Sequence, residues 1–347
     1  MPEQRYLTAL MADIEAALPL VWGRTVRSIF IGGGTPSLFS PQAIDQLLSD
    51  VRARLHVNAL CEITLEANPG TFETDRFKAY RQAGITRLSI GVQSFQDEFL
   101  KTLGRVHNRE QALAAVHEAA QTFDTFNLDL MYALPGQTLT TLRQDVATAL
   151  SLQPPHLSLY QLTIEPNTLF AKHPPTVADN DTAADMLDLI THMTGQAGLH
   201  RYEVSAYAQA GHACQHNLNY WQYGDYLGIG AGAHSKISFA HQVLRQVRWH
   251  DPMRYMAQAL AGNAIAQKNE VSSADLVFEF MLNALRLADG FDVQLIMDRT
   301  GCTANITDTL DRAVRQGFVM LNGTHVQPTA RGFDFLSDLQ MMFLPSK

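Results

Sequence analysis

The stretch that decides the fold is VRSIFIGGGTPS, residues 26–37. Its first part, residues 26–31, predicts a buried strand, and this strand runs directly into Gly32, Gly33 and Gly34. Residues 41–55 then show the apolar spacing of an amphipathic helix. A strand that turns through glycines into a helix is half of a βαβ unit, so the pattern predicts a parallel sheet.

The same alternation continues through the first half of the chain. Predicted strands and helices follow one another at 62–66 (strand), 74–83 (helix), 87–90 (strand), 109–122 (helix), 126–131 (strand), 139–152 (helix) and 156–159 (strand). Short strands joined by helices are typical of parallel α/β sheets. With the strand at 26–31 they form a long series, which favours a barrel or part-barrel over a short open sheet.

Residues 1–20 also have a helical pattern, with apolar residues at Leu7, Leu10, Met11 and Ile14. A helix that begins a series of βα units normally follows a strand, and no strand precedes this one in the sequence. The expected fold class is therefore α/β, with a partial TIM-like barrel that lacks its first strand.

The pattern changes after about residue 235. Before that point we expect a helix at 180–195, a strand at 201–205 and a glycine-rich loop at 223–232. Beyond it, helices are predicted at 273–287, 293–300 and 305–316, followed by a hairpin at 318–321 and 325–327. Helices that close on a short hairpin indicate a winged-helix-like domain. We expect two domains, a partial barrel over 1–235 and a smaller helical domain over 236–347.

Composition excludes several classes of protein. The net charge is −8, from 26 basic and 34 acidic residues, and no Lys or Arg cluster stands out, so nucleic acid is not an expected partner. No apolar run is long enough to span a membrane, and acidic residues interrupt the first 20, unlike a signal peptide. Cys61, Cys214 and Cys302 are odd in number and far apart, which favours a reducing, cytoplasmic location.

Glycine and polar residues follow successive predicted strands, and these are the candidate site residues. They are Gly33, Gly34 and Thr35 after the first strand, Glu66 after the second, Gln93 and then Arg105 after the third, and Asp129 near the end of the fourth. In parallel α/β barrels, the carboxyl ends of the strands form the edge where active sites lie. We therefore expect these residues to share one site.

The residue types suggest a ligand. Glycine lets backbone groups approach closely, and the Glu66 carboxylate suits an ammonium group. Arg105 suits a carboxylate through paired hydrogen bonds, and Asp129 suits the two hydroxyls of a ribose. Ammonium, carboxylate and ribose together describe S-adenosylmethionine. Taken singly, the glycines could form a simple turn, Glu66 a cap or an ion pair, and Arg105 a surface residue. Their order along the strands favours the shared site.

Five segments carry a resemblance to a known family. They are IFIGGGTPS at 29–37, EANPG at 66–70, IGVQSF at 90–95, LGR at 103–105 and NLDLM at 127–131. They resemble radical-SAM proteins related to oxygen-independent coproporphyrinogen III oxidase, and the resemblance extends over nearly the whole chain. It implies that S-adenosylmethionine is contacted by Gly33, Gly34, Thr35, Glu66, Gln93, Arg105 and Asp129.

A second motif, His-Asn-x-x-Tyr-Trp at 216–221, is similar to the signature of the haem-chaperone branch of this family, called HemW. Imidazole is a good axial ligand for haem iron, and flat rings can flank a porphyrin. From the residues alone, His216 and Asn217 could equally hydrogen-bond the loop while Tyr220 and Trp221 fill the core. The resemblance favours haem contacts by all four, with His216 as the candidate iron ligand.

The family holds a [4Fe–4S] cluster with Cys-x-x-x-Cys-x-x-Cys after its first strand, and this sequence has no such triplet. A zinc site in His-x-Cys-x-His, residues 212–216, is disfavoured because no fourth ligand stands out nearby. We expect that Met1 is an internal methionine and that upstream reading frame encodes the strand and the triplet. A natural cluster-free relative is the alternative. The chain as given is expected to perform no radical chemistry, so no catalytic residue is assigned.

The leading hypothesis is a cytoplasmic haem chaperone of the radical-SAM family, and whether the chain is an enzyme stays open. Its expected partners are haem and a haem-acceptor protein, for which respiratory and membrane-associated proteins are candidates. The alternative is an oxygen-independent coproporphyrinogen III oxidase, which decarboxylates a porphyrin precursor. A third hypothesis is an unrelated barrel enzyme that binds neither haem nor S-adenosylmethionine.

Overall fold

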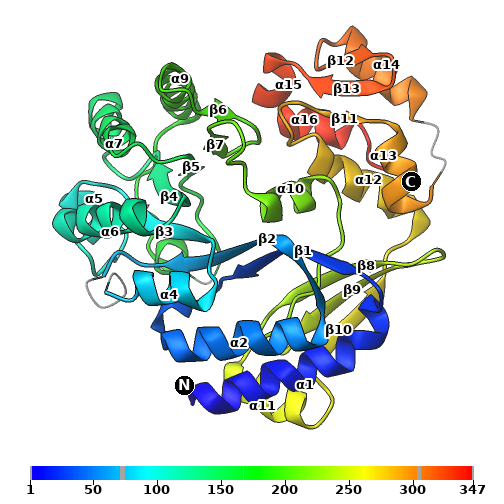
Figure 1. Ribbon diagram of the computed structural model, residues 1–347. Coiled ribbons are helices and arrows are strands. Elements are labelled where there is room, and N and C mark those ends of the chain that lie inside the picture. Colours follow the sequence, from blue (N-terminus) through cyan, green and yellow to red (C-terminus); the bar gives the residue numbers. More distant parts are fainter. Residues whose placement is uncertain (1, 71–74, 167, 303–305, 346–347) are drawn as a thin grey trace. The chain divides into compact units, whose positions relative to one another are not determined.

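The structure is a computed structural model that describes residues 2–70, 75–166, 168–302 and 306–345 (Figure 1). Its contacts divide the chain into two compact units. The sheet unit contains Ser28–Asp45 and Glu62–Ala213, and the tail unit contains Met1–Arg27, Gln46–Cys61 and Cys214–Lys347. The boundary expected between residues 235 and 236 stays a prediction.

The main sheet has seven strands in the order β1-β2-β3-β4-β5-β7-β6. They are β1 (Thr25–Ile31), β2 (His56–Ala67), β3 (Arg87–Gln93), β4 (Thr125–Tyr132), β5 (His156–Gln161), β6 (His200–Arg201) and β7 (Ala206–Ala208). Strands β2 to β5 pair in parallel, whereas β7 pairs antiparallel with β5 and with β6. Five successive strands in chain order confirm the predicted α/β partial barrel, and β1 lies at one edge of the sheet.

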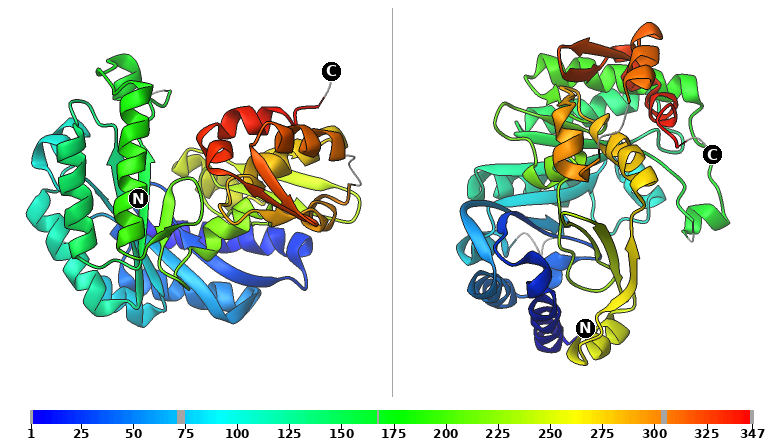
Figure 2. Two further views of the ribbon diagram at one scale, coloured as in Figure 1. Left: turned by 90° about the horizontal axis from the view of Figure 1, so that it is seen from above. Right: turned by 90° about the vertical axis from the view of Figure 1, so that its right-hand side faces the viewer.

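Helices lie along one side of strands β3 to β5, as Figures 1 and 2 show. They are α4 (Phe77–Ala83), α5 (Asp97–Thr102), α6 (Arg109–Thr122), α7 (Leu139–Ser151) and α9 (Asn180–Gln196), while α2 (Pro41–Arg54) precedes β2. Helix α6 contacts both β3 and β4, because small residues form its buried face: Ala112, Ala115 and Ala119 are fully buried. The strands are consequently covered on this side by apolar packing.

Local signals placed most helix boundaries correctly. Helix α6 begins at Arg109 as predicted, because Asn108 and Gln111 form a capping box in which each side chain accepts a hydrogen bond from the other's backbone N–H, both at 3.0 Å. Helix α7 begins in the same way after Thr138. The predicted helix at 74–83 is present from Phe77 onward, and its first residue, 74, lies outside the described residues.

The predicted strand at 201–205 is wrong. Strand β6 ends at Arg201, β7 begins at Ala206, and the residues between them form a turn. The Glu203 carboxylate accepts hydrogen bonds from the backbone N–H and the hydroxyl of Ser205, both at 3.0 Å, and so stabilises the turn. One short strand in the prediction is therefore an antiparallel pair of shorter ones.

The tail unit contains a second sheet that the sequence pattern did not predict. Strands β8 (His234–Ser238), β9 (Val243–Arg248) and β10 (Ile265–Glu270) pair antiparallel. Helix α1 (Glu3–Val21) lies beside α11 (Pro252–Leu260) in Figure 1, and the two helices are in contact. Arg248 and Asp13 form an ion pair at 3.3 Å, and both side chains are almost completely buried. The Tyr255 hydroxyl also donates to Asp13, at 2.9 Å.

The end of the chain forms helices closed by a small sheet, as predicted. Its elements are α12 (Ser273–Ala284), β11 (Phe291–Asp292), α13 (Gln294–Thr300), α14 (Thr307–Arg315), β12 (Val319–Asn322), β13 (His325–Pro328), α15 (Ala330–Asp334) and α16 (Leu336–Met341). Strands β12 and β13 form the predicted hairpin, and β11 adds a third strand. Phe280, Ile296, Leu310, Val326 and Leu339 belong to its apolar core.

Candidate functional site

The glycine turn after β1 is joined to the end of β2. Gly33 and Gly34 have φ of +85° and +63°, which other residues rarely adopt, and the Gly33 N–H donates to Glu66 Oε2 at 2.9 Å. A Cβ on Gly32 would lie 2.6 Å from the Phe30 ring and 2.9 Å from the Glu66 carboxyl carbon. A side chain at Gly32 would therefore force the Phe30 ring and the Glu66 carboxylate to shift. Thr35 follows and precedes the short 3-10 helix η1 (Pro36–Leu38).

The end of β3 carries a strained, buried Gln93. Its φ is +66°, and the pairing of β3 with β4 shifts register between Ile90 and Gln93. A Cβ on Gly91 would lie 3.0 Å from Gln93 Nε2 and 3.7 Å from Asn68 Oδ1, so the Gln93 amide is turned toward the end of β2. Backbone strain of this kind costs of order 1–3 kcal/mol and persists where the surrounding structure holds it. The Gln93 side chain therefore lies beside the end of β2, the strand that carries Glu66.

Asp129 on β4 is held by hydrogen bonds on both carboxylate oxygens. The Ser89 hydroxyl donates to Oδ2 and the Asn127 amide to Oδ1, each at 2.8 Å. Burial raises the pKa of Asp129 to about 6, hydrogen bonds from Ser89, Asn127 and Ser158 oppose this shift, and the nearby charge of Glu66 adds to it. Glu66 and Asp129 therefore lie within electrostatic range of each other.

Arg105 brings a positive charge to the same edge of the sheet. It follows α5 through Gly104, which has φ of +70°, and its N–H donates to Leu100 O at 2.9 Å. Partial burial lowers the pKa of Arg105, and attraction to the Asp129 carboxylate opposes that change. The structure thus brings together Glu66, Arg105 and Asp129, with the glycine turn bonded to Glu66 and Gln93 turned toward the same strand end.

These residues fit an adenosyl amino acid. The glycine turn at residues 32–34 is exposed, so a ligand can approach its backbone, while two carboxylates and one guanidinium offer partners for ammonium, hydroxyl and carboxylate groups. Two carboxylates beside a single cation leave the site with excess negative charge, which an ammonium group would balance. The binding of S-adenosylmethionine by these residues stays a prediction.

The His-Asn-x-x-Tyr-Trp motif forms helix α10 (Gln215–Trp221) in the tail unit. The His216 ring stands edge-on to Tyr220, with centroids 4.8 Å apart, and Tyr220 lies 4.4 Å from Tyr226. Burial lowers the pKa of His216 to about 4, so its imidazole is neutral at pH 7. No residue of α10 is fully buried, so Asn217 and its neighbours all retain accessible surface.

Cationic and acidic side chains that sequence reasoning missed surround this motif. The Arg286 guanidinium lies 4.2 Å from the centre of the Trp221 ring, a cation–π contact. Arg245 donates to the Tyr226 hydroxyl at 2.8 Å and forms an ion pair with Glu279. Of these residues, only Tyr226 lies in a segment that the sequence singled out, the glycine-rich loop expected at 223–232. Nothing in the sequence indicates that Arg245, Glu279 and Arg286 lie beside α10, because they are on β9, on α12 and just after α12.

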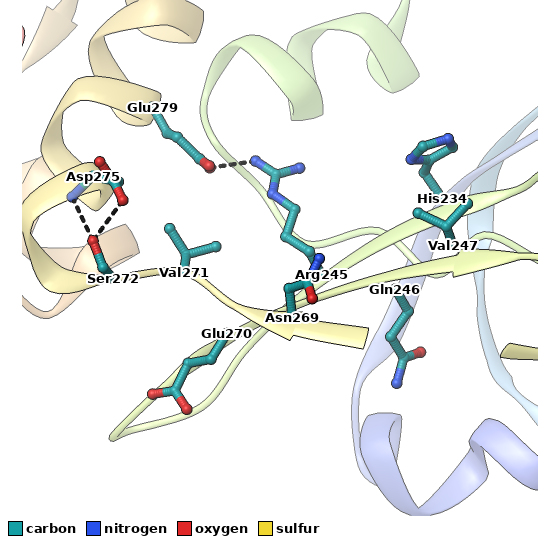
Figure 3. A pocket seen from close by; sticks show the side chains of 10 residues that line it. All are labelled: His234, Arg245, Gln246, Val247, Asn269, Glu270, Val271, Ser272, Asp275 and Glu279. Atoms are coloured by element: carbon teal, nitrogen blue, oxygen red, sulfur yellow. Dashed lines mark hydrogen bonds and ion pairs between the residues drawn. The ribbon is translucent and has the colours of Figure 1, made fainter. Parts of the chain in front are cut away.

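The tail unit also has an open groove of about 430 Å³, shown in Figure 3. It lies along β8–β10 and the start of α12, and its walls are His234, Arg245, Gln246, Val247, Asn269, Glu270, Val271, Ser272, Asp275 and Glu279. The Arg245–Glu279 ion pair lies among these residues, and Ser272 with Asp275 forms the cap of α12. None of the residues predicted for either ligand lines this groove.

The described residues offer no set of metal ligands. Across residues 2–70, 75–166, 168–302 and 306–345, no group of three or more His, Cys, Asp or Glu side chains is arranged to hold a metal ion. Cys61 and Cys214 are buried, Cys302 is partly exposed, and none of the three is in a disulfide. The cysteines of this sequence therefore do not fit the family's iron–sulfur cluster. Within the same ranges, no helix is both long and apolar enough to cross a bilayer.

Comparison with known proteins agrees with the resemblance. A model of the radical SAM superfamily matches residues 6–149, and a model of the HemN C-terminal domain matches residues 271–335. The heme chaperone HemW of Escherichia coli (strain K12) is 44% identical, over 99% of this chain and 91% of that protein. HemW of Bacillus subtilis (strain 168) is 32% identical, over 86% of this chain and 80% of that protein.

Two further relatives extend the comparison. The mitochondrial radical S-adenosyl methionine domain-containing protein 1 of Mus musculus is 34% identical, over 97% of this chain and 79% of that protein. The solved structure of coproporphyrinogen III oxidase (HemN) from Escherichia coli covers 98% of this chain and 83% of its own, with a TM-score of 0.81 at 24% identity. At this level of identity, the similarity to the solved structure supports a shared fold and nothing further. Identity of 44% over 99% of the chain identifies the family: the chain belongs to the HemW family of radical-SAM proteins.

Proposed function

We propose that this chain is a haem chaperone, which binds haem and S-adenosylmethionine and passes haem to an acceptor protein in the cytoplasm. The observation that carries the proposal is the 44% identity to the heme chaperone HemW over 99% of the chain. The arrangement of the His-Asn-x-x-Tyr-Trp motif on one partly exposed helix supports it.

Binding of S-adenosylmethionine is assigned to the strand ends of the sheet unit. Glu66 would take the ligand's ammonium group, Arg105 its carboxylate and Asp129 its ribose hydroxyls. The glycine turn at Gly33 and Gly34, with Thr35 and Gln93, would provide backbone and amide contacts. In this family the ligand supplies radical chemistry beside an iron–sulfur cluster, for which this chain's cysteines are unsuited, so the role proposed here is binding.

Haem binding is assigned to α10. A neutral imidazole is the form that coordinates iron, and the low pKa of His216 keeps that form present throughout the physiological range. Tyr220 and Trp221 present flat rings, and Asn217 lies next to His216 on the helix. The acceptor would be a protein that needs haem, with respiratory and membrane-associated proteins as candidates.

The second candidate function is oxygen-independent coproporphyrinogen III oxidase. Its support is the fold shared with the Escherichia coli enzyme, at 24% sequence identity. The haem-chaperone motif on α10 and the higher identity to HemW favour the chaperone.

A haemin titration tests the proposal. The wild-type chain should show a saturable Soret shift, and His216→Ala should bind at least about tenfold more weakly with a changed Soret maximum, because the imidazole ligand is lost. His241→Ala, which removes an exposed histidine between β8 and β9, is the matched control and should bind like the wild type. Equal spectra for His216→Ala and wild type would exclude His216 as the ligand.

Two other results would overturn the chaperone itself. One is the absence of saturable haem binding by the wild-type chain. The other is the formation of protoporphyrinogen from coproporphyrinogen III under anaerobic, reducing conditions, which would favour the oxidase.

A further inference from the structure

Five polar side chains, which we call the polar ladder, lie next to Asp129 inside the sheet unit. They are Ser89 on β3, Asn127 on β4, His156 and Ser158 on β5, and Tyr202 in the turn after β6. Strand pairing sets Ser89 opposite Asn127, Asn127 opposite His156, and Asp129 opposite Ser158. Residues two apart on a strand share a face, so the strand members of the ladder and Asp129 lie on one face of the sheet.

The hydrogen bonds of the ladder can run in only one direction. An ionised Asp129 only accepts, so the Asn127 amide must present its NH₂ group to Oδ1 and its oxygen to the other side. That oxygen accepts from the Ser158 hydroxyl at 3.0 Å and lies 2.7 Å from His156 Nδ1. His156 must therefore carry its proton on Nδ1.

The chain of donors ends at Tyr202. With the proton on Nδ1, the other ring nitrogen of His156 has a lone pair, and the Tyr202 hydroxyl lies 2.9 Å from it and donates. Burial lowers the pKa of His156 well below its usual range, and Arg87 and His212 lower it further, so the ring stays neutral and keeps this tautomer. The Ser89 hydroxyl accepts from Asn127 and donates to Asp129 Oδ2, both at 2.8 Å.

Stability alone does not explain why these polar side chains are buried in the sheet unit. His156, Ser158 and Asn127 are 1%, 2% and 4% exposed, where the interior of a barrel normally holds branched apolar residues. Buried polar networks offer little net stability over apolar packing of the same volume, although they enforce one geometry when every member is satisfied. The ladder converges on Asp129, the acid assigned to the ligand's ribose.

We propose that Ser89, Asn127, His156, Ser158 and Tyr202 are positioning residues that orient the Asp129 carboxylate toward the ribose hydroxyls and so make the site select ribose over deoxyribose. Ser89 donates to one oxygen of Asp129 and Asn127 to the other, which fixes the plane of the carboxylate that would face the ligand. The inference rests on the proposed binding of S-adenosylmethionine.

The relative affinity for two ligands tests this proposal. The probes are S-adenosylhomocysteine and its 2′,3′-dideoxy analogue, and the measurement is the ratio of their dissociation constants by calorimetry. Hydrogen bonds to a charged group make this ratio roughly ten to one hundred for the wild type. Ser89→Ala and Tyr202→Phe each remove one hydroxyl of the ladder, and each should lower the ratio about threefold or more.

Ser94→Ala is the matched control. The Ser94 hydroxyl also donates to a buried carboxylate of the sheet unit, Asp145, at 2.6 Å, but it is not part of the ladder. A general loosening of the fold would weaken both ligands alike, so the control should keep the wild-type ratio. Wild-type binding with unchanged ratios in Ser89→Ala and Tyr202→Phe would overturn the ladder alone. No binding of S-adenosylhomocysteine by the wild type would overturn the proposed site and, with it, this inference.

Discussion

At the scale of single residues, Asp129 is the most informative group in the sheet unit. Burial, the charge of Glu66 and the hydrogen bonds from Ser89 and Asn127 act on one carboxylate, and burial is the largest effect. The resulting pKa of about 6 means that a modest drop in pH protonates it. An aspartate with an ordinary pKa near 4 would stay ionised under the same conditions.

The affinity for S-adenosylmethionine should therefore depend on pH. Ribose hydroxyls donate to an ionised carboxylate, so the ligand binds the deprotonated form, which is lost as the pH falls through about 6. Between pH 5 and 7 the ligand keeps its own charges. We expect a nearly constant dissociation constant near pH 7 and above, and a rise approaching tenfold per pH unit below 6. Calorimetry from pH 5 to 7 measures this.

Asp129→Asn is the control for the pH effect. An amide does not titrate in this range, so the variant should bind weakly with little change between pH 5 and 7. The same steep pH dependence in Asp129→Asn would show that another group is responsible.

At the scale of elements, the close approach of α15 to Phe318, the residue before β12, depends on one glycine. Gly332 lies in α15, and a Cβ there would be 1.9 Å from the carbonyl oxygen of Phe318, a backbone atom that cannot move aside easily. That carbonyl already accepts the backbone N–H of Thr329 at 2.9 Å, so the contact also involves the residue that caps α15.

Gly332→Ala should accordingly destabilise the tail unit by about 3 kcal/mol, the upper part of the range for overpacking. Urea unfolding followed by tryptophan fluorescence measures this change directly, because Trp22, Trp221 and Trp249 all belong to the tail unit.

The matched control is Gly195→Ala in α9, where nothing lies within 4 Å of the added Cβ. It should stabilise the chain by up to about 1 kcal/mol through helix propensity, as followed by circular dichroism. A loss below about 1 kcal/mol for Gly332→Ala would contradict the proposed close contact.

At the scale of the whole molecule, the two proposed ligands are assigned to different units. Asp129 lies in the sheet unit and His216 in the tail unit, and each unit has its own buried apolar residues. Substitutions that share no interaction partners usually have additive effects.

Each substitution should therefore affect one ligand. Asp129→Asn should weaken S-adenosylhomocysteine binding about tenfold and leave the haemin titration unchanged, whereas His216→Ala should do the reverse. The double variant should combine both losses. A change of more than about threefold in the other ligand's affinity would indicate energetic coupling between the two sites, and calorimetry and Soret titration would detect it.

The sequence by itself determined the order of strands and helices in the sheet unit and the residues at the strand ends. Helix α6 begins and ends as predicted, and Glu66, Arg105 and Asp129 come together, because capping, periodicity and the common edge of parallel strands are local or topological rules. The second sheet was missed because its short strands, such as β10 with its mostly exposed residues, show no clear alternation.

Only the tertiary structure decided which distant residues meet. Asp13 and Arg248 are 235 residues apart, and Asn127, His156 and Tyr202 come from separate segments. Nothing in the local pattern around a buried Asp, His or Tyr specifies its partner, because the free energy of burying a polar group depends on what the fold places opposite it. The register between neighbouring strands depends on the whole sheet, and this register brings the strand residues of the polar ladder together.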